Sequence, residues 1–284
     1  MVLATNAFEA LIEEGIQLLD GQSDQPKLEA ETLLGHVTGR SRTHFRAFAE
    51  TEVTAPEALL YRELIEQRRS GQPIAYLIGA REFWSLSFEV TPDVLIPRPE
   101  TELLVEIALD WVRPLSAPRL LDLGTGSGAI PISIAKERPD ANLTAVDLCP
   151  RALALAQKNA KRLGAAGIHF LVGDWLEALT SAEPFDLIVS NPPYIPDQDA
   201  HLTRGDLRYE PRSALASGPD GLNAIRTIAR DARAFIKPGG GLALEHGFDQ
   251  APAIRDILGD LGYHAIETRE DLQRHPRVTM ARYA

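Results

Sequence analysis

The sequence predicts an α/β protein in which a mostly parallel, Rossmann-like sheet follows a small all-α bundle. Three observations lead to this prediction. The N-terminal region shows only helical periodicity, apolar strands alternate with amphipathic helices from Pro99 onward, and the last two strands follow one another without an intervening helix. Alternating strands and helices form a parallel sheet covered on both faces, and the final pair is expected to close it as an antiparallel hairpin.

Residues 1–82 are expected to form the bundle. Phe8, Leu11 and Leu19 recur at helical spacing, and two further apolar stripes follow. The stretch Thr54-Ala55-Pro56-Glu57 is typical of a capped helix start. No polar constellation in this region suggests chemistry, so we interpret it as a docking or lid domain.

Residues 83–97 are interpreted as a β-hairpin that links the bundle to the sheet. The run 83–90 is rich in aromatic and β-branched residues, Thr91-Pro92-Asp93 is the expected turn, and 94–96 is the expected returning strand. Residues 98–284 then form the sheet domain. Its strands are expected at 119–123, 143–148, 169–172, 185–190 and 241–245, and its closing hairpin at 264–268 and 278–283.

The composition is that of a globular protein that works in the cytoplasm. Of the 284 residues 44% are hydrophobic, but no apolar run approaches the roughly 18 residues of a membrane span, and the acidic N-terminus is unlike a signal peptide. With Cys149 as the lone cysteine and scattered histidines, we expect neither a disulfide nor a metal site. The net charge of -11 argues against stable nucleic-acid binding, which relies on basic side chains at phosphates.

A glycine-rich turn marks the candidate cofactor site. A buried strand leads into Gly124-Thr125-Gly126-Ser127-Gly128, where glycines allow a sharp turn and close approach of a ligand. Asp147, at the end of the next strand, can bind the hydroxyls of a ribose. Asp174 can accept from an adenine amino group and Trp175 can pack against its ring, although an indole here equally suits an ordinary core. These residues fit either NAD or S-adenosylmethionine.

The candidate reaction site is Asn191-Pro192-Pro193-Tyr194, which follows the strand 185–190 at the carboxyl edge of the sheet. The two prolines stiffen the turn and remove two N–H donors. The side chain of Asn191 and the carbonyl of Pro192 can accept both N–H groups of an amide-type NH₂, which directs its delocalised lone pair toward a methyl donor. Tyr194 would stack on or wall the acceptor. This turn favours S-adenosylmethionine over NAD.

The chain resembles the HemK-type protein-(glutamine-N5) methyltransferases, which modify peptide chain release factors. The resemblance implies a class I methyltransferase fold, and S-adenosylmethionine bound by the 124–128 turn, Asp147, Trp175 and Asn191. It implies that Asn191 to Tyr194 hold the glutamine of a Gly-Gly-Gln tripeptide, and that the bundle helps to grip the release factor. Arg98 and Glu100 would either line the pocket or fix the domain junction. The matching stretches are 71–79, 95–102, 124–128, 191–196, 209–212 and 237–240.

Three other functions remain open on the sequence. An N6-adenine nucleic-acid methyltransferase would share the Asn-Pro-Pro-Tyr turn, but the acidic charge argues against it. An NAD-dependent oxidoreductase would share the glycine-rich turn and Asp147, but it leaves the Asn191 turn unexplained. A protein that binds release factors without methylating them predicts that Asn191→Ala has no effect.

Overall fold

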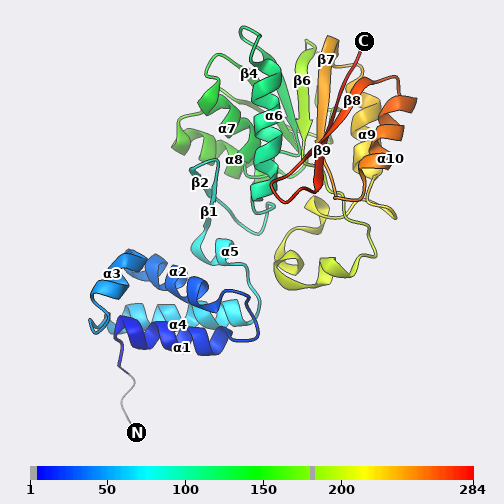
Figure 1. The fold of residues 1–284 in the computed structure, drawn as a ribbon. Helices are drawn as coiled ribbons and strands as arrows, with labels where there is room; N and C mark the ends of the chain where they lie inside the picture. The colour runs from blue at the N-terminus through cyan, green and yellow to red at the C-terminus, as the bar shows by residue number, and fades with distance from the viewer. Residues whose placement is uncertain (1–4, 180–182) are drawn as a thin grey trace. The chain divides into compact units, whose positions relative to one another are not determined.

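The computed structural model describes residues 5–179 and 183–284 (Figure 1). The chain forms two compact units, Met1–Gly79 and Ala80–Ala284, each with its own apolar core. None of the described helices has the length and apolar character that crossing a bilayer requires.

The first unit is a helical bundle, as the periodicity predicts. Leu11 and Leu33 are fully buried in its core, together with Ile65. The predicted cap at Thr54 is confirmed, because its hydroxyl accepts from the Glu57 amide and the Glu57 carboxylate accepts from the Thr54 amide. The helices are α1 (Phe8–Leu19), α2 (Pro26–Thr38), α3 (Arg42–Ala47), α4 (Ala55–Arg69) and α5 (Ile74–Ile78).

The close packing of α1 against α4 depends on Gly15. A Cβ at this position would lie 2.1 Å from the hydroxyl oxygen of Tyr61. That hydroxyl is buried and donates to the Leu11 carbonyl at 3.0 Å. Gly15 therefore leaves the space through which Tyr61 reaches the backbone of α1, and the two helices are joined by a satisfied buried hydrogen bond.

The second unit begins with a hairpin whose turn differs from the prediction. Its strands are β1 (Ala80–Phe83) and β2 (Leu86–Glu89). The hairpin turn is therefore at Trp84 and Ser85. Thr91-Pro92-Asp93 does form a turn, in which the Val94 N–H donates to the Thr91 carbonyl at 3.1 Å, but this turn does not join the strands of the hairpin as expected. Both residues have positive φ (52° and 55°), a geometry that asparagine and glycine usually supply in two-residue hairpin turns. The Trp84 N–H donates to the Glu102 carboxylate at 2.7 Å, which anchors the turn.

Residues 94–96, expected as the returning strand, form a loop instead. The N–H of Ile96 donates to the carboxylate of Glu210 at 3.1 Å, so a side chain takes the place of a strand partner. The strand that does return, β2, is fastened to α8 (Pro150–Leu163) by Asn159. The side chain of Asn159 exchanges two hydrogen bonds of 2.9 Å with the backbone of Glu89.

The described residues form a seven-stranded sheet in the order β5-β4-β3-β6-β7-β9-β8. The strands from β5 to β7 are parallel, and the closing pair β8 and β9 is antiparallel. Both predictions are thereby confirmed, but the sequence did not indicate that β9 lies between β7 and β8. The strands are β3 (Arg119–Leu123), β4 (Asn142–Asp147), β5 (His169–Val172), β6 (Phe185–Ser190), β7 (Ile236–Glu245), β8 (His264–Glu270) and β9 (Pro276–Arg282).

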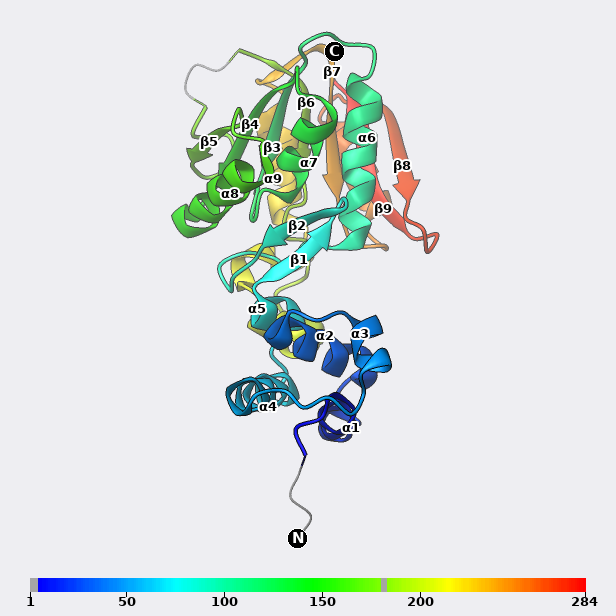
Figure 2. The same cartoon turned by 90° about the vertical axis from the view of Figure 1, so that its left-hand side faces the viewer.

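Apolar side chains alternate between the two faces of this sheet. Along β3, Leu120 joins the core under α6, α7 and α8, whereas Leu121 joins the core under α9 and α10. Figure 2 shows α6, α7 and α8 on the near face of the sheet and α9 behind it. The helices not yet located are η1 (Pro99–Thr101), α6 (Glu102–Val112), α7 (Ala129–Glu137), η2 (Ala200–Thr203), η3 (Gly205–Tyr209), η4 (Arg212–Ala214), α9 (Asn223–Ala232) and α10 (Ala251–Asp260).

Candidate active site

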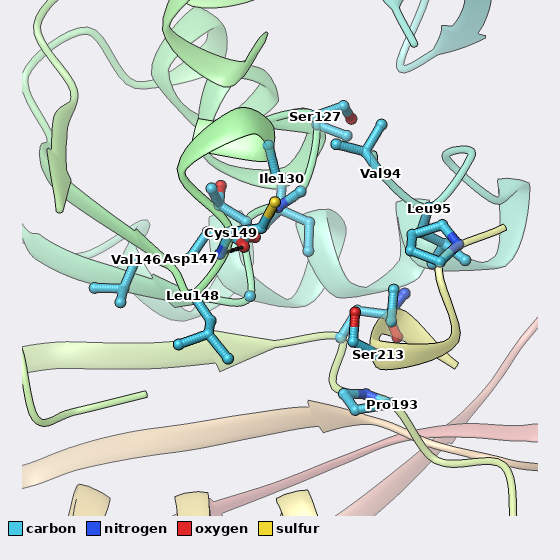
Figure 3. Close-up of a pocket in the computed structure, with 18 of the residues that line it drawn as sticks. Val94, Leu95, Ser127, Ile130, Val146, Asp147, Leu148, Cys149, Pro193 and Ser213 are labelled. Carbon is cyan, nitrogen blue, oxygen red and sulfur yellow. Dashed lines mark hydrogen bonds between the residues drawn. The ribbon is translucent and has the colours of Figure 1, made fainter. Parts of the chain in front are cut away.

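A cavity of about 260 Å³ opens at the carboxyl ends of β3, β4 and β6. Because β3 lies between β4 and β6, the chain leaves β3 toward one side and later returns on the other, which is where such sheets bind ligands. Both predicted motifs contribute to its walls, and so do the loop before η1 and the last two residues of η4. In Figure 3, Leu148 and Cys149 lie on one side of the cavity and Leu95 and Ser213 on the other.

The glycine-rich turn forms one wall of the cavity through residues 124–127. Its first two N–H groups both donate to the Val146 carbonyl, at 2.9 and 3.0 Å, which ties the turn to β4. Gly128 does not line the cavity but caps α7 with φ +83°. A Cβ on Gly128 would lie 2.8 Å from Cδ1 of Ile132, so the turn requires glycine here for both backbone conformation and space.

Asp147 lines the cavity with a carboxylate that is already hydrogen bonded. Its Oδ2 accepts from the N–H of Gly126 and its Oδ1 accepts from the N–H of Cys149, both at 2.8 Å. Burial raises the pKa of Asp147, and these two N–H groups oppose the rise. A carboxylate has about four acceptor sites, so Asp147 can hold the turn and still accept from a ribose.

Asp174 and Trp175 follow β5 and also line the cavity. Trp175 has φ +48°, and its ring would contact a Cβ on Gly124 at 3.4 Å. The indole also packs against the core beneath α9. Trp175 therefore serves both interpretations that the sequence left open, as part of the core and as a wall of the cavity.

The Asn191 turn is only partly in this cavity. Asn191 and Pro193 line it, whereas Tyr194 lines a neighbouring cavity of about 530 Å³ and Pro192 is buried. The Asn191 Nδ2 donates to Oγ1 of Thr101 at 3.1 Å. Within the described ranges, no group donates to the Asn191 Oδ1 or to the Pro192 carbonyl. The Asn191 Oδ1 is thus an unpartnered acceptor at the cavity, whereas the Pro192 carbonyl belongs to a residue that lines neither cavity.

Tyr194 is held at both its ends. Its carbonyl accepts from Nε2 of Gln250 at 2.9 Å, and its hydroxyl lies 3.5 Å from Oε1 of Glu245. Burial raises the pKa of Tyr194, and the neighbouring Glu245 charge raises it further, so the phenol stays protonated.

Two buried acids at this edge of the sheet were not singled out from the sequence. Asp122 in β3 and Glu245 at the end of β7 are each only 1% exposed. Burial raises the pKa of each to about 7, and no described group bonds to either oxygen of Asp122 or to Oε2 of Glu245. In the sequence they are ordinary strand carboxylates, and only the tertiary fold brings Glu245 to the Asn191 turn.

The sequence left open whether Arg98 lines the pocket or fixes the domain junction, and the structure shows that it lines the cavity. Its guanidinium pairs with the carboxylate of Glu210, which also accepts from the N–H of Ile96. Burial raises the pKa of Glu210, and the Arg98 charge opposes the rise. The pair joins two cavity walls that are far apart in the sequence. Glu100 lines the neighbouring cavity instead.

The fold and the site define a class I methyltransferase. A Methyltransferase domain model matches residues 115–269, which hold the glycine-rich turn and Asn191. The catalytic domain of hMettl16, solved with the MAT2A 3′UTR hairpin 1, has the same fold. It aligns with a TM-score of 0.59 and 14% identity over 88% of this chain and 90% of that chain.

Within that class, the chain belongs to the family of release factor glutamine methyltransferases. The PrmC N-terminal domain model matches residues 10–79. The release factor glutamine methyltransferase of Bordetella pertussis is 50% identical over 254 residues, which are 89% of this chain and 94% of the relative. That of Salmonella typhimurium is 47% identical over 277 residues, 97% of this chain and 99% of the relative. The resemblance seen in the sequence is confirmed.

The cofactor of this family, S-adenosylmethionine, fits the charges of the site. It carries a positive sulfonium, whereas NAD carries two negative phosphates. Asp147 and Asp174 line the cavity, and Asp122 is buried beside Asp147. Among the described lining residues the cation is Arg98, which Glu210 already neutralises. This lining attracts a sulfonium and repels a pyrophosphate, which argues against the oxidoreductase alternative.

Proposed function

We propose that the protein transfers a methyl group from S-adenosylmethionine to the side-chain amide nitrogen (N5) of the glutamine in the Gly-Gly-Gln motif of peptide chain release factors. The observation that supports this most is the Asn191 turn, whose Oδ1 and Pro192 carbonyl accept from no described group. Two acceptors on one stiff turn match the two N–H groups of a primary amide. The relatives at 47–50% identity are named as release factor glutamine methyltransferases.

The chemistry follows from what these two acceptors do. S-adenosylmethionine supplies a methyl group on a positively charged sulfur, which departs as a neutral thioether. An amide nitrogen is a poor nucleophile, because its lone pair is delocalised into the carbonyl. Asn191 and Pro192 hold this nitrogen through its N–H groups and keep its lone pair directed at the methyl. As the N–C bond forms and the C–S bond breaks, the nitrogen releases one of its two protons to solvent, so the product is a neutral N-methyl amide. Pro193 excludes water from the same side and so protects the reacting geometry.

We assign the cofactor to the glycine-rich side of the cavity. Residues 124–127 lie against it, Gly128 keeps the turn and α7 in place, and Asp147 accepts from its ribose. Asp174 and Trp175 lie at its adenine. The accepting glutamine lies against Asn191, Pro192, Pro193 and Tyr194.

The bundle of residues 1–79 helps to grip the release factor, and residues 80–97 connect it to the catalytic domain of residues 98–284. The match of residues 10–79 to the PrmC N-terminal domain supports this assignment. The proposal includes no stable binding to nucleic acids or to membranes. A substrate that acts in translation termination also implies a cytoplasmic location.

The test is single-turnover transfer of labelled methyl to a purified release factor. Asn191→Ala is expected to slow transfer by about a hundredfold or more, because the nitrogen loses one of its two positioning acceptors. Asn142→Ala is the matched control, since Asn142 is exposed and lies at the opposite end of β4 from the cavity. Wild-type transfer by Asn191→Ala would contradict the proposal, and label on nucleic acid but not on protein would favour the N6-adenine alternative.

A further inference from the structure

The exposed apolar side chains of the second unit gather at one edge of its sheet. Among the described residues of this unit, five large apolar side chains are exposed: Leu115, Leu148, Val172, Phe248 and Leu272. The last four lie at the carboxyl edge, where the Asn191 turn lies, and Leu115 precedes β3 at the other edge. Leu148 lines the cofactor cavity, but Phe248 and Leu272 line neither cavity. The proposed chemistry therefore does not account for the exposure of these two residues.

Leu272 is displayed by a rigid turn between β8 and β9 (Figure 2). The buried Asp271 holds this turn, since its Oδ1 accepts from the N–H groups of Gln273 and His275 at 2.9 and 3.0 Å. Its own N–H donates to the His275 carbonyl at 2.9 Å, and its Oδ2 pairs with Arg277 at 3.2 Å. Leu272, next to this network, is fully exposed. A leucine on a turn that is already ordered can bind a partner at little cost in conformational entropy.

Phe248 lies in the loop after β7, and Gln250 fastens this loop to the reaction turn. The Gln250 Oε1 accepts from the N–H of Gly247, and its Nε2 donates to the carbonyl of Tyr194, both at 2.9 Å. The ring of Phe248 is 62% exposed, and its centroid lies 5.9 Å from that of His275 in the β8–β9 turn. The two exposed apolar residues thus lie on neighbouring segments, and one of these segments is bonded to the turn that we assign to the accepting glutamine.

The cavity of about 530 Å³ provides a second connection between the two places. Tyr194 lines it from the reaction turn, and Arg277 lines it from the start of β9. The charged residues that flank the two apolar ones in sequence are of both signs, Asp249 and Glu270 as well as Arg274. A surface for a polyanion would need clustered basic groups, whereas aromatic and aliphatic residues with mixed charges around them are typical of an interface with a protein.

We infer that Phe248 and Leu272 form a docking surface for an apolar patch on the release factor, separate from the site that takes its glutamine. This inference rests on the proposed function, because the release factor is the protein that must then come to this edge of the sheet. Contacts outside the reaction site distinguish a whole protein from a short peptide with the same tripeptide. The surface should therefore contribute to the affinity for the factor and leave the methyl transfer itself unchanged.

The kinetic test compares two substrates, the purified release factor and a short synthetic peptide that contains Gly-Gly-Gln. Phe248→Ser and Leu272→Ser are each expected to raise the KM for the factor about tenfold, with kcat and the Kd of S-adenosylmethionine unchanged. Transfer to the peptide should not change, because the peptide does not reach the surface. Leu115→Ser is the matched control, since it removes an exposed leucine from the opposite edge of the sheet, and it should change none of these constants.

An unchanged KM for the factor in both variants would overturn the inference, and so would an equal loss with the peptide, which would place the residues in the reaction site. Analytical ultracentrifugation provides a further test. A wild-type dimer that Leu272→Ser dissociates would show that the surface joins two copies of this chain, which would also overturn the inference. A wild type that methylates neither substrate would instead overturn the proposed function. Calorimetric binding of the factor, weakened by both serine variants and not by Leu115→Ser, would then still support the docking surface.

Discussion

The two halves of the catalytic cavity are built in different ways. On the cofactor side, the glycine-rich turn is fixed by its own backbone and by Asp147 and Val146 of the adjacent strand. On the acceptor side, the Asn191 turn is stiffened by prolines, but its side chains bond to Thr101 and Glu245, which come from distant parts of the chain. The first half is a local structure, and the second is complete only in the folded domain.

This difference predicts different consequences of mutation. Damage to the cofactor side should weaken binding of S-adenosylmethionine, because the turn is the binding surface. Damage to the acceptor side should lower kcat and leave that binding in place, because those residues orient the reacting nitrogen.

The largest effect is expected from Gly128→Ala. The new Cβ would meet Ile132 at 2.8 Å and the residue would be held at φ +83°, so the turn must shift. Affinity for S-adenosylmethionine should fall by about a hundredfold, measured by calorimetry, and stability should fall by about 3 kcal/mol in urea. Gly262→Ala is the matched control, with φ +85° but nothing within 4 Å. Equal effects of the two substitutions would show that crowding at the turn does not matter.

Asp147→Asn should have the next largest effect. Asparagine keeps one oxygen acceptor, but it cannot accept from Gly126 and Cys149 with two oxygens as Asp147 does. We expect the Kd of S-adenosylmethionine to rise about tenfold and kcat to change little, because a lost charge-assisted hydrogen bond contributes roughly 1.5 kcal/mol or more. If Asp147→Asn lowered kcat without changing the Kd of S-adenosylmethionine, the assignment of cofactor binding to this half of the cavity would be contradicted.

A pH dependence should follow from Glu245. Burial raises its pKa from 4.5 to about 7, so the negative charge beside the Asn191 turn, 3.5 Å from the Tyr194 hydroxyl, is lost as the pH falls through about 7. The kcat of the wild type should fall over that range, and the kcat of Glu245→Gln should vary less, because its side chain does not titrate. Equal pH profiles would contradict the role of the carboxylate.

The free energy of unfolding should change with pH in the opposite direction to kcat. The folded state binds the Glu245 proton more tightly than the unfolded chain does, so stability falls as the pH rises from about 4.5 through about 7. Glu245→Gln removes this loss. Its free energy of unfolding, relative to that of the wild type, should therefore increase with pH across this window, which urea denaturation at several pH values would measure.

The smallest effect is expected from Tyr194→Phe. The tyrosine hydroxyl lies 3.5 Å from Glu245, which is the long limit of a hydrogen bond, and Phe keeps the aromatic wall. We expect kcat to change by no more than about threefold. A loss as large as that of Asn191→Ala would show that the Tyr194 hydroxyl, and not only its ring, positions the acceptor.

Much of the cofactor side could be predicted from the sequence, because it is determined locally. Residues 119–123, 169–172 and 185–190 are strands as predicted, and Gly124 to Ser127 line the cavity. The turn of the first hairpin could not be predicted, since Trp84 and Ser85 adopt positive φ without the usual glycine or asparagine. The hydrogen bonds of Asn191 could not be predicted either. Its partner is 90 residues away, and no local pattern connects them.

The most direct test of the account is tandem mass spectrometry of a purified release factor after incubation with the enzyme and S-adenosylmethionine. The account predicts one added methyl group on the glutamine of the Gly-Gly-Gln motif, and none when that glutamine is replaced by alanine. Methylation of the alanine variant to the same extent, or of another residue in the wild-type factor, would contradict it.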